Sequence, residues 1–567
     1  MKMASGRRFK TAALAACLAA SMGLVAACSG AGGDQSGQSG QSGAKADGPT
    51  LVVFAGSQTP IVGNFNPYSP TVLPSAMGGI YEPLFYYNKA ADTDPIGLLA
   101  ESVDWAQDGL SLTIHMRPGV KWNDGQDLTA EDIIYSFTND GVDMDYVDGA
   151  EKIDDQTVQL NFNTPSFTNE YSLLGATYIV PERIFSAQAD LVTFDNATAP
   201  VGTGPFMLDS LTDASYTVVA NPNYWDKGHP GINRVQYLGI DGNSSAESLF
   251  KAGELDYSTM FVPDPTQLTS TGRLGYLNAS SPNPISILTC SNADLGCTGA
   301  QTDKAVRQAF NLALDRKEIN EKAYYGLASP ASPTFTKPGR DDRWVAEGMP
   351  TQNAETADVS AAKAVLEKAG YALGADGIYA KDGQRASFNL ASVEGWSDAN
   401  AAAELMVAQA KAAGIEVKAE TVTMDQYTDM RQAGNYEMIV SALLGTAISD
   451  PFTIYRNSFT TSYTEPVGTA LEPSETNYAR YSNPEVDEAV AQAAGTNDEA
   501  EKAAAYAIVQ KNIVEDLPYI PMFHGGSQTF FNNVDFDGWP SEDNLFAFPA
   551  SWDGVSSAYV LSHLTYK

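Results

Sequence analysis

The chain has 567 residues, of which 43% are hydrophobic and 18% are charged, which predicts a globular protein with more than one folding unit. Its 69 acidic residues outnumber its 34 basic residues and give a formal net charge of −35. A surface of that sign repels phosphate backbones, so the composition excludes nucleic acid as an expected partner.

The N-terminal segment has the pattern of a secretory signal peptide, which we assign to residues 1–27. Basic residues precede an apolar run from about 11 to 27 that is short for a membrane span. The run ends in Val25-Ala26-Ala27-Cys28, which resembles the lipobox of bacterial lipoproteins and implies a lipid on Cys28. The alternative is an ordinary signal peptide in which Cys28 has no role. Residues 28–48 are rich in Gly, Ser and Gln and predict a flexible tether.

The first half of the remaining chain reads mainly as strands. A short apolar run or an alternation of apolar and polar residues predicts a strand at residues 50–54, 110–116, 157–162 and 216–220. Thr129, followed by two acidic residues and then by Ile133 and Phe137, predicts the start of a helix.

The later half is richer in helices. Apolar spacing predicts helices at residues 303–323, 359–369 and 399–413, and Gly370 and Gly414 offer stops after the second and third. Strands are expected at 416–422 and 437–442. Helices alternating with strands indicate an α/β unit, and we find no internal repeat.

The two remaining cysteines beyond the signal, Cys290 and Cys297, lie seven positions apart in a polar segment. In an exported protein this spacing favours a disulfide. The alternative, a metal site, would need further ligands, and no His lies nearby.

Motifs for catalysis or metal binding are absent from the sequence. The four histidines, His115, His229, His524 and His563, have no metal-ligand spacing. Neither a nucleophile elbow nor a phosphate-binding loop occurs, and Gly202-Thr203-Gly204 before a proline is typical of a structural turn. We therefore expect no catalytic residues, no cofactor and no metal. Carboxylates are too numerous for a glycosidase pair to be recognised from sequence, so that alternative stays open.

Several fragments, in the right order along nearly the whole mature chain, resemble the family 5 solute-binding proteins of the oligopeptide and dipeptide type. They are Asn64-Phe65-Asn66-Pro67, Ile80-Tyr81-Glu82-Pro83-Leu84, Leu99-Ala100-Glu101-Ser102, the block from Arg117 to Gly125 that continues into 128–133, Gly202-Thr203-Gly204-Pro205-Phe206, Asn221-Pro222-Asn223-Tyr224-Trp225, and 304–310 with Leu314-Asp315-Arg316.

The resemblance implies an α/β fold of the large two-lobed periplasmic-binding-protein type (class II, cluster C), with an extra subdomain at about 90–200 in the first lobe. Residues 49–298 with 526–567 would form a discontinuous first lobe, and residues 299–525 the second. A ligand held between the lobes would stabilise a closed form that the permease subunits of an ABC importer recognise.

The ligand class is where the residues depart from the peptide-binding pattern. In peptide-binding relatives an Asp of a Trp-x-x-Asp-Tyr-x-Asp-Pro-like motif pairs with the α-ammonium of the peptide. In the matching stretch from Leu444 to Pro451, Ala447 stands at that place, which weakens the peptide interpretation because a buried cation needs a counter-charge. Asp450 is the remaining carboxylate there, with capping of the next helix as its alternative role.

A second set of residues resembles the branch of the family that binds β-linked oligosaccharides. The segment 538–544 carries this likeness together with Asn64 to Tyr68. Sugars are held by aromatic faces and by hydrogen bonds, so Trp396 and Trp539 are candidates for stacking, with packing inside a lobe as the alternative. The candidate ligand-binding residues are Asn66, Tyr68, Trp396, Gly445, Asp450 and Trp539.

The sequence therefore predicts a monomeric, exported, non-enzymatic binding subunit of an ABC importer, anchored to the outer face of the cell membrane only through Cys28. Peptide uptake is the first interpretation. An oligosaccharide such as cellobiose is the alternative ligand, and a secreted glycosidase is the remote one.

Overall fold

The computed structural model describes residues 48–567 except 70, 142, 143 and 472–474. The predicted signal peptide, Cys28 and almost all of the predicted tether lie outside the described residues. No helix among the described residues combines the length and the apolar character that crossing a membrane requires.

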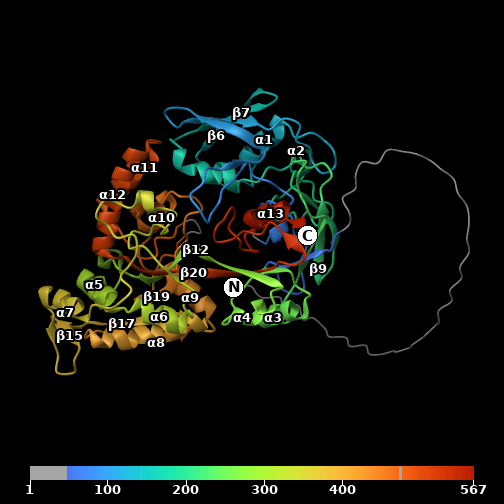
Figure 1. The fold of residues 1–567 in the computed structure, drawn as a ribbon. Coiled ribbons are helices and arrows are strands. Elements are labelled where there is room, and N and C mark those ends of the chain that lie inside the picture. Colours follow the sequence, from blue (N-terminus) through green and yellow to red (C-terminus); the bar gives the residue numbers. More distant parts are fainter. Residues whose placement is uncertain (1–47, 70, 142–143, 472–474) are drawn as a thin grey trace, which may run out of the picture. The chain divides into compact units, whose positions relative to one another are not determined.

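One large mixed sheet of 11 strands organises the fold (Figure 1). The two central strands are antiparallel, parallel pairs lie on both sides of them, and one edge of the sheet ends in two further antiparallel pairs. In spatial order the main path is β18 (Glu416–Val422), β17 (Ser387–Val393), β19 (Met438–Ala442), β12 (Leu274–Thr289), β20 (Tyr519–Asn532), β11 (Tyr257–Thr259), β1 (Leu51–Phe54), β10 (Arg234–Leu238), β9 (Ser215–Ala220) and β8 (Phe206–Leu211), and β13 (Ser329–Pro330) pairs with β20 off this path.

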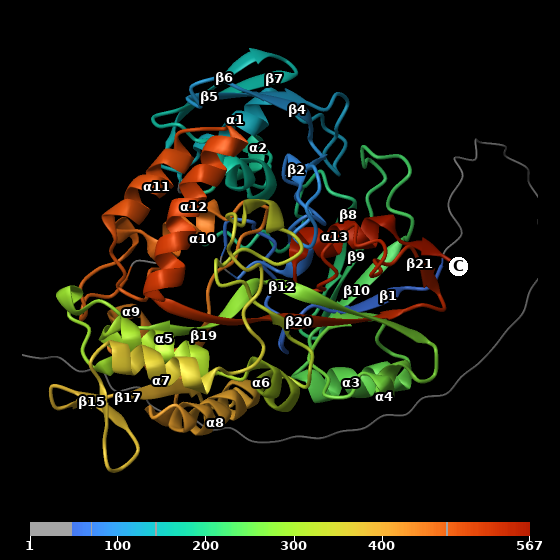
Figure 2. The same ribbon diagram turned by 60° about the vertical axis from the view of Figure 1, so that its left-hand side comes forward.

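The two longest strands, β12 and β20, run antiparallel beside each other and join the two halves of this sheet (Figure 2). The buried apolar side chains near one end of these two strands pack into different clusters from those near the other end. Residues 51–274 and 530–564 form three clusters, and residues 287–523 form two others. We call these two groups the first lobe and the second lobe. Cys290 and Cys297, placed in the first lobe by the sequence division, pack in a second-lobe cluster.

The first lobe carries a separate four-stranded sheet of β4 (Ala100–Trp105), β5 (Ser111–Met116), β7 (Thr157–Phe162) and β6 (Val147–Asp154). Helix α1 (Ala130–Thr138) packs on β6 and β7, at the top of Figure 2. Thr129 caps α1 through a reciprocal pair of hydrogen bonds with Asp132, which confirms the helix start predicted from sequence. The other helices of the lobe are α2 (Glu182–Phe185), α3 (Asn243–Ala252), α4 (Thr266–Thr269) and α13 (Gly554–His563).

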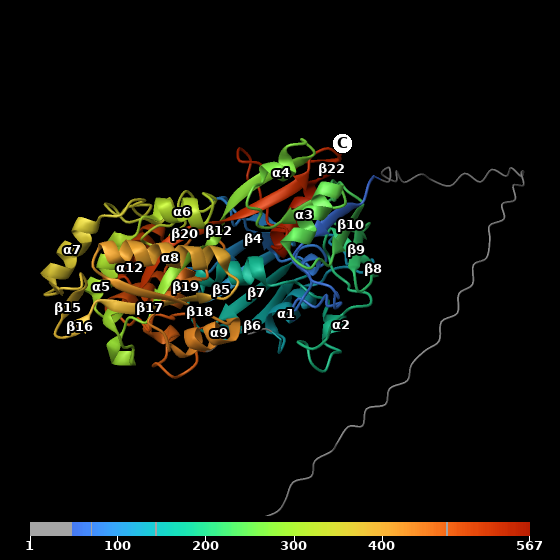
Figure 3. The same cartoon turned by 90° about the horizontal axis from the view of Figure 1, so that it is seen from below.

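The second lobe carries most of the helices. Helix α8 (Ser397–Ala412) packs on β17 and β18, as Figure 3 shows from below. Helices α10 (Phe452–Phe459), α11 (Pro484–Ala494) and α12 (Glu499–Asp516) pack in sequence order against one another, and α7 (Val359–Lys368) packs on α5 (Lys304–Ala313). The remaining helices are α6 (Arg316–Ala323) and α9 (Met424–Ala433).

The single helix predicted at 303–323 is wrong in one respect, because the segment forms two helices, α5 and α6. The chain is extended at Leu314 and Asp315, and the Asp315 side chain accepts a hydrogen bond from the backbone N–H of Glu318, which starts α6. The apolar spacing continues across the break because both helices bury one face in the same cluster. Periodicity alone therefore hides the break, whereas Asp315 followed by Glu318 marks it.

Candidate functional site

The connection between the lobes is irregular on both strands. The pairing of β12 with β20 shifts register between Ser280 and Pro284, opposite Gly525 and Gly526. A bulge of this kind interrupts the hydrogen-bond ladder and bends the strands locally. The bend lies where the buried clusters change from one lobe to the other.

An arginine of the second lobe contacts the first lobe beside this crossing. Arg340 is 3% exposed and Asp341 is 1% exposed. The Arg340 guanidinium donates to both carboxylate oxygens of Asp341 at 2.6 and 2.9 Å, and to the carbonyl and hydroxyl oxygens of Thr446. It also donates to the Lys89 carbonyl of the first lobe at 3.1 Å, while the Lys89 ammonium pairs with Asp553 at 2.6 Å.

A cavity of about 730 Å³ is lined by residues of both lobes. Its size lies in the range of small-molecule binding sites. The first lobe contributes Tyr87, Asp92, Thr93, Asp94, Pro95, Phe167, Thr168 and Glu170, and the second lobe contributes Arg343, Trp344, Ile448, Ser449, Asp450, Asn497, Glu499 and Lys502. This inter-lobe cavity is the candidate ligand site.

The charges of the inter-lobe cavity are mostly negative, with five carboxylates against two cations. Arg343 bridges the lobes, because it lies 3.6 Å from Asp92 and 3.2 Å from Glu499. Glu170 instead accepts a hydrogen bond from the Tyr87 hydroxyl at 2.8 Å, and burial is the main cause that raises the pKa of Tyr87. A cavity with these groups can bind a ligand that carries charged and hydrogen-bonding ends.

Asp450 is the one sequence-predicted ligand residue that lines the inter-lobe cavity, and its carboxylate already has several partners. It accepts from the backbone N–H of Phe452 at the start of α10, from the Tyr506 hydroxyl and from the Lys502 ammonium at 3.2 Å. Both of its predicted roles are therefore compatible with its position, since it orders a helix start and faces the cavity.

Gly445 lies against the irregular part of β12. Its backbone N–H donates to the side chain of Asn283, and a Cβ atom at this position would lie 1.9 Å from the Pro282 carbonyl oxygen. The absence of a side chain is therefore needed for the close approach of two backbone segments beside the strand crossing.

We expect Gly445→Ala to lower the free energy of unfolding by about 1–3 kcal/mol, because the methyl group must push the β12 bulge aside. Urea denaturation of the mature protein measures this. Gly149→Ala is the matched control, since nothing lies within 4 Å of its added Cβ. Equal unfolding midpoints for the two variants would contradict the close approach.

Asn66 and Tyr68 lie in the first lobe and have partners within it. The Asn66 side chain is buried and donates to the Leu191 carbonyl, while its oxygen accepts from the Tyr68 backbone. The Tyr68 hydroxyl accepts from Asn139, and burial is the main cause that raises the pKa of Tyr68. Neither residue lines the inter-lobe cavity.

The two tryptophans predicted to stack on a ligand also pack within the lobes. Trp539 stacks on Phe531 with ring centroids 5.0 Å apart and donates its indole N–H to the Asn532 carbonyl. Trp396 packs edge-on against Tyr427 at 5.3 Å. The tryptophan that does line the inter-lobe cavity is Trp344, whose indole N–H donates to the Ser449 carbonyl.

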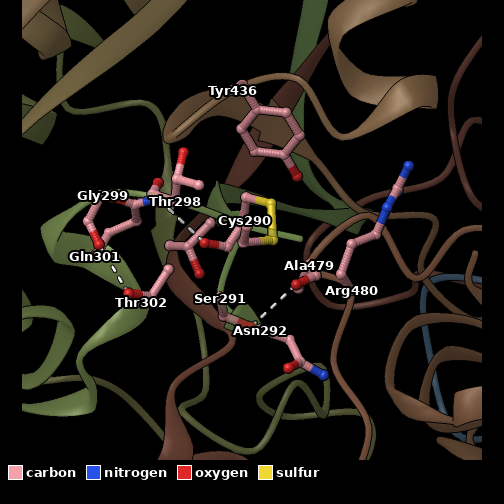
Figure 4. The surroundings of a disulfide bond; sticks show 12 residues. Cys290, Ser291, Asn292, Thr298, Gly299, Gln301, Thr302, Tyr436, Ala479 and Arg480 are labelled. Atoms are coloured by element: carbon pink, nitrogen blue, oxygen red, sulfur yellow. Dashed lines mark hydrogen bonds between the residues drawn. A yellow bond between two sulfur atoms is a disulfide. The ribbon is translucent and has the colours of Figure 1, made fainter. Parts of the chain in front are cut away.

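Cys290 and Cys297 form a disulfide in the second lobe, with Cα atoms 5.4 Å apart (Figure 4). The surrounding hydrogen bonds fix this loop to distant parts of the lobe. The Cys290 N–H donates to the Glu437 carbonyl, and the Ser291 hydroxyl donates to the Ala479 carbonyl.

The double substitution Cys290→Ala and Cys297→Ala removes this disulfide. We expect it to lower the free energy of unfolding by about 2–3 kcal/mol, because the unfolded chain then regains the entropy that closing this short loop had removed. Urea denaturation with and without reductant checks this. Reductant must shift the midpoint of the wild-type protein and leave that of the double variant unchanged. A wild-type midpoint insensitive to complete reduction would contradict the prediction.

Most residues of the inter-lobe cavity had no sequence signal. They come from the segments 92–95, 167–170 and 497–499, which carry no motif, and only the fold brings them together. Among the described residues, no group of three or more His, Cys, Asp or Glu side chains has a metal-binding arrangement.

The sequence matches the family described as "Bacterial extracellular solute-binding proteins, family 5 Middle" over residues 94–465. Protein XP55 of Streptomyces lividans is 29% identical over 504 residues, which cover 84% of each chain. The oligopeptide-binding protein AppA of Bacillus subtilis is 26% identical and covers 75% of this chain and 77% of its own.

Solved structures show the same fold. The periplasmic oligopeptide-binding protein of an oligopeptide ABC transporter from Thermotoga maritima superposes with a TM-score of 0.81 at 23% identity, covering 91% of this chain and 99% of its own. The mannohexaose-bound structure of that transporter's binding protein gives a TM-score of 0.72 at 23% identity, with coverage of 91% and 98%.

Proposed function

Because the chain belongs to the bacterial extracellular solute-binding proteins of family 5, which serve ABC importers, we propose that it is the lipid-anchored subunit that captures short peptides and delivers them to the permease. The observation that carries the proposal is the inter-lobe cavity, since both lobes contribute to its lining. The proposal assigns no catalytic step to the protein. Its anchor is Cys28 followed by the tether at 28–48, as the sequence predicts.

Capture follows from the arrangement of the two lobes about the β12–β20 crossing. A ligand that contacts Glu170 on one wall and Lys502 on the other interacts with both lobes only when they are close together. That difference in contacts shifts the population toward the closed form. The closed form then presents both lobes to the permease in one fixed arrangement.

The cavity lining supports a peptide as the first choice of ligand. Carboxylates and cations on facing walls suit a zwitterion with polar backbone groups. Oligosaccharide binding would depend on aromatic faces. The predicted Trp396 and Trp539 pack against other residues and do not line the cavity, whose aromatic residues are Tyr87, Phe167 and Trp344. Several relatives are oligopeptide- or glutathione-binding proteins by name.

The second candidate is a β-linked oligosaccharide, held in the same cavity. It is favoured by Ala447, because peptide-binding relatives place a carboxylate there for the α-ammonium group. A thermal-shift panel on residues 49–567 separates the two. At a hundredfold excess over the dissociation constant, a ligand that binds only the folded state stabilises it by about 3 kcal/mol.

We expect di- to pentapeptides to raise the melting temperature and cello-, manno- and xylo-oligosaccharides to leave it unchanged. A shift with oligosaccharides alone would transfer the proposal to the second candidate. No shift with either panel would contradict both.

A further inference from the structure

A pocket of about 340 Å³ in the second lobe shares no lining residue with the inter-lobe cavity. We call it the acidic pocket, because its charged side chains are Glu420 and Glu437 and no basic side chain occurs among the described residues that line it. Thr298, Asn389 and Asn435 add neutral side-chain oxygens. Two carboxylates without a basic residue in the lining attract a positive ion.

Gln301 lies beside the acidic pocket and has an acceptor atom without a partner. The residue is 0% exposed, and its Nε2 donates to the carbonyl oxygens of Thr298 at 2.7 Å and Cys290 at 3.3 Å. These two bonds fix which end of the amide is the nitrogen. The Oε1 atom has no hydrogen-bond partner in the part of the chain that the structure describes. Because a buried acceptor in this state costs free energy, a partner from solution is favoured.

The unpartnered oxygen of Gln301 faces a carboxylate of the acidic pocket. Figure 4 shows Gln301 next to Gly299. A Cβ atom added to Gly299 would lie 2.4 Å from Gln301 Oε1 and 2.5 Å from Glu437 Oε1, so the two oxygens flank one point. The Glu437 Oε2 accepts from the Asn389 backbone N–H at 2.6 Å, whereas no hydrogen bond or ion pair to its Oε1 occurs within the described ranges. Neither oxygen can donate to the other, so the pair lacks a partner that is positively charged or donates.

From this pair of oxygens we infer a calcium site at the acidic pocket, formed by Gln301 Oε1 and Glu437 Oε1. Ca²⁺ prefers oxygen donors, accepts about 6–8 of them and tolerates irregular geometry. The amide and the carboxylate supply two, and water together with the other oxygens of the pocket supplies the rest. Soft metals such as zinc find no histidine and no free thiol among the described lining residues, since Cys297 is in the disulfide.

The ion links two segments that already meet at the disulfide. The Cys290 N–H donates to the carbonyl of Glu437, directly before β19, and Gln301 follows the disulfide loop in the chain. Bound calcium therefore stabilises this part of the second lobe. The inference goes beyond the proposed function and does not depend on which ligand the inter-lobe cavity binds.

Calorimetric titration of the protein of residues 49–567, freed of metal with EDTA and then of EDTA, tests the site. We expect Ca²⁺ to bind with a dissociation constant on the order of 10⁻⁴–10⁻³ M, the range of extracellular calcium modules, and Mg²⁺ to bind at least about tenfold more weakly. Calcium must also raise the melting temperature above that in sodium chloride at equal ionic strength. If calcium does not bind saturably, or binds no more tightly than magnesium, the inference is wrong.

Glu437→Gln removes the charge of the site and must weaken calcium binding at least about tenfold. The new amide can still accept from the Asn389 N–H and can donate to Gln301 Oε1, so in EDTA the variant must melt no lower than the wild-type protein. Glu404→Gln is the matched control, since it removes an exposed carboxylate of α8 outside the pocket, and must keep the wild-type affinity. Equal affinities of the two variants would exclude Glu437 as a ligand. A Glu437→Gln variant that melts several degrees lower in EDTA would show that the carboxylate serves the fold instead.

Terbium luminescence locates the ion. Tb³⁺ replaces Ca²⁺ at oxygen sites and emits when a nearby tyrosine absorbs light, and Tyr436 lines the acidic pocket. Emission must appear with the wild-type protein, fall when Ca²⁺ is added, and weaken in Tyr436→Phe while that variant keeps its calcium affinity. Emission that is unchanged in Glu437→Gln would place the ion elsewhere on the acidic surface and would overturn the assignment.

Discussion

Replacing Arg340 with methionine is expected to lower the free energy of unfolding by about 3–5 kcal/mol, because it leaves the Asp341 carboxylate buried without its partner. Both side chains are almost fully buried, and the pair is bidentate. The substitution also removes the contact of the second lobe with the Lys89 carbonyl of the first. Urea denaturation followed by circular dichroism measures the loss.

Two further variants separate charge from packing at this position. Arg343→Met removes an exposed arginine that has only partly exposed ion pairs, so a change below about 1 kcal/mol is expected. Asp341→Asn in the Arg340→Met background removes the unpaired charge and must recover part of the lost stability. A double variant as unstable as the single one would contradict the argument.

Glu82→Gln is expected to change how stability depends on pH. Glu82 is 1% exposed, and burial raises its pKa to about 8, against which hydrogen bonds from Tyr224 and Trp225 act. Between about pH 5 and 8 the folded protein therefore holds a proton that the unfolded chain has released. The wild-type free energy of unfolding must fall by about 1.4 kcal/mol per pH unit from this group as the pH rises through that range.

Glutamine is neutral at every pH and can accept the same hydrogen bonds, so the variant lacks this contribution. The stability of Glu82→Gln relative to the wild-type protein must rise from pH 5 to pH 8, as urea titrations at four pH values would show. Glu101→Gln, at an exposed carboxylate 3.8 Å from Arg117, is the control and must leave the pH profile unchanged. Parallel profiles for the wild-type protein and Glu82→Gln would contradict a raised pKa.

Local sequence patterns predicted individual elements well where one face is buried and the other exposed. The alternation at 157–162 gives β7, and the capping pattern at Thr129 gives the start of α1. The same reasoning missed the break between α5 and α6, because apolar periodicity records burial and continues across an interruption of the backbone.

The site was harder to predict, for a physical reason. A carboxylate such as Asp450 is informative only once its neighbours are known, and those neighbours come from α10 and α12. Trp539 was a candidate by residue type, and the structure places it against Phe531 and outside the lining of the inter-lobe cavity. Residue type indicates which chemistry is possible, and only the fold shows which groups lack partners.

In the proposed function, a ligand draws the two lobes together about the β12–β20 crossing. Spin labels on Asp155→Cys in the first lobe and Glu488→Cys in the second lobe measure this by pulsed electron resonance, since both positions are exposed. Cys290 and Cys297 are paired with each other, so in a protein of residues 49–567 the spin label reacts only with the two introduced cysteines. We predict a shorter and narrower distance distribution when a peptide that raises the melting temperature is added. An unchanged distribution with that peptide bound would contradict capture between the lobes.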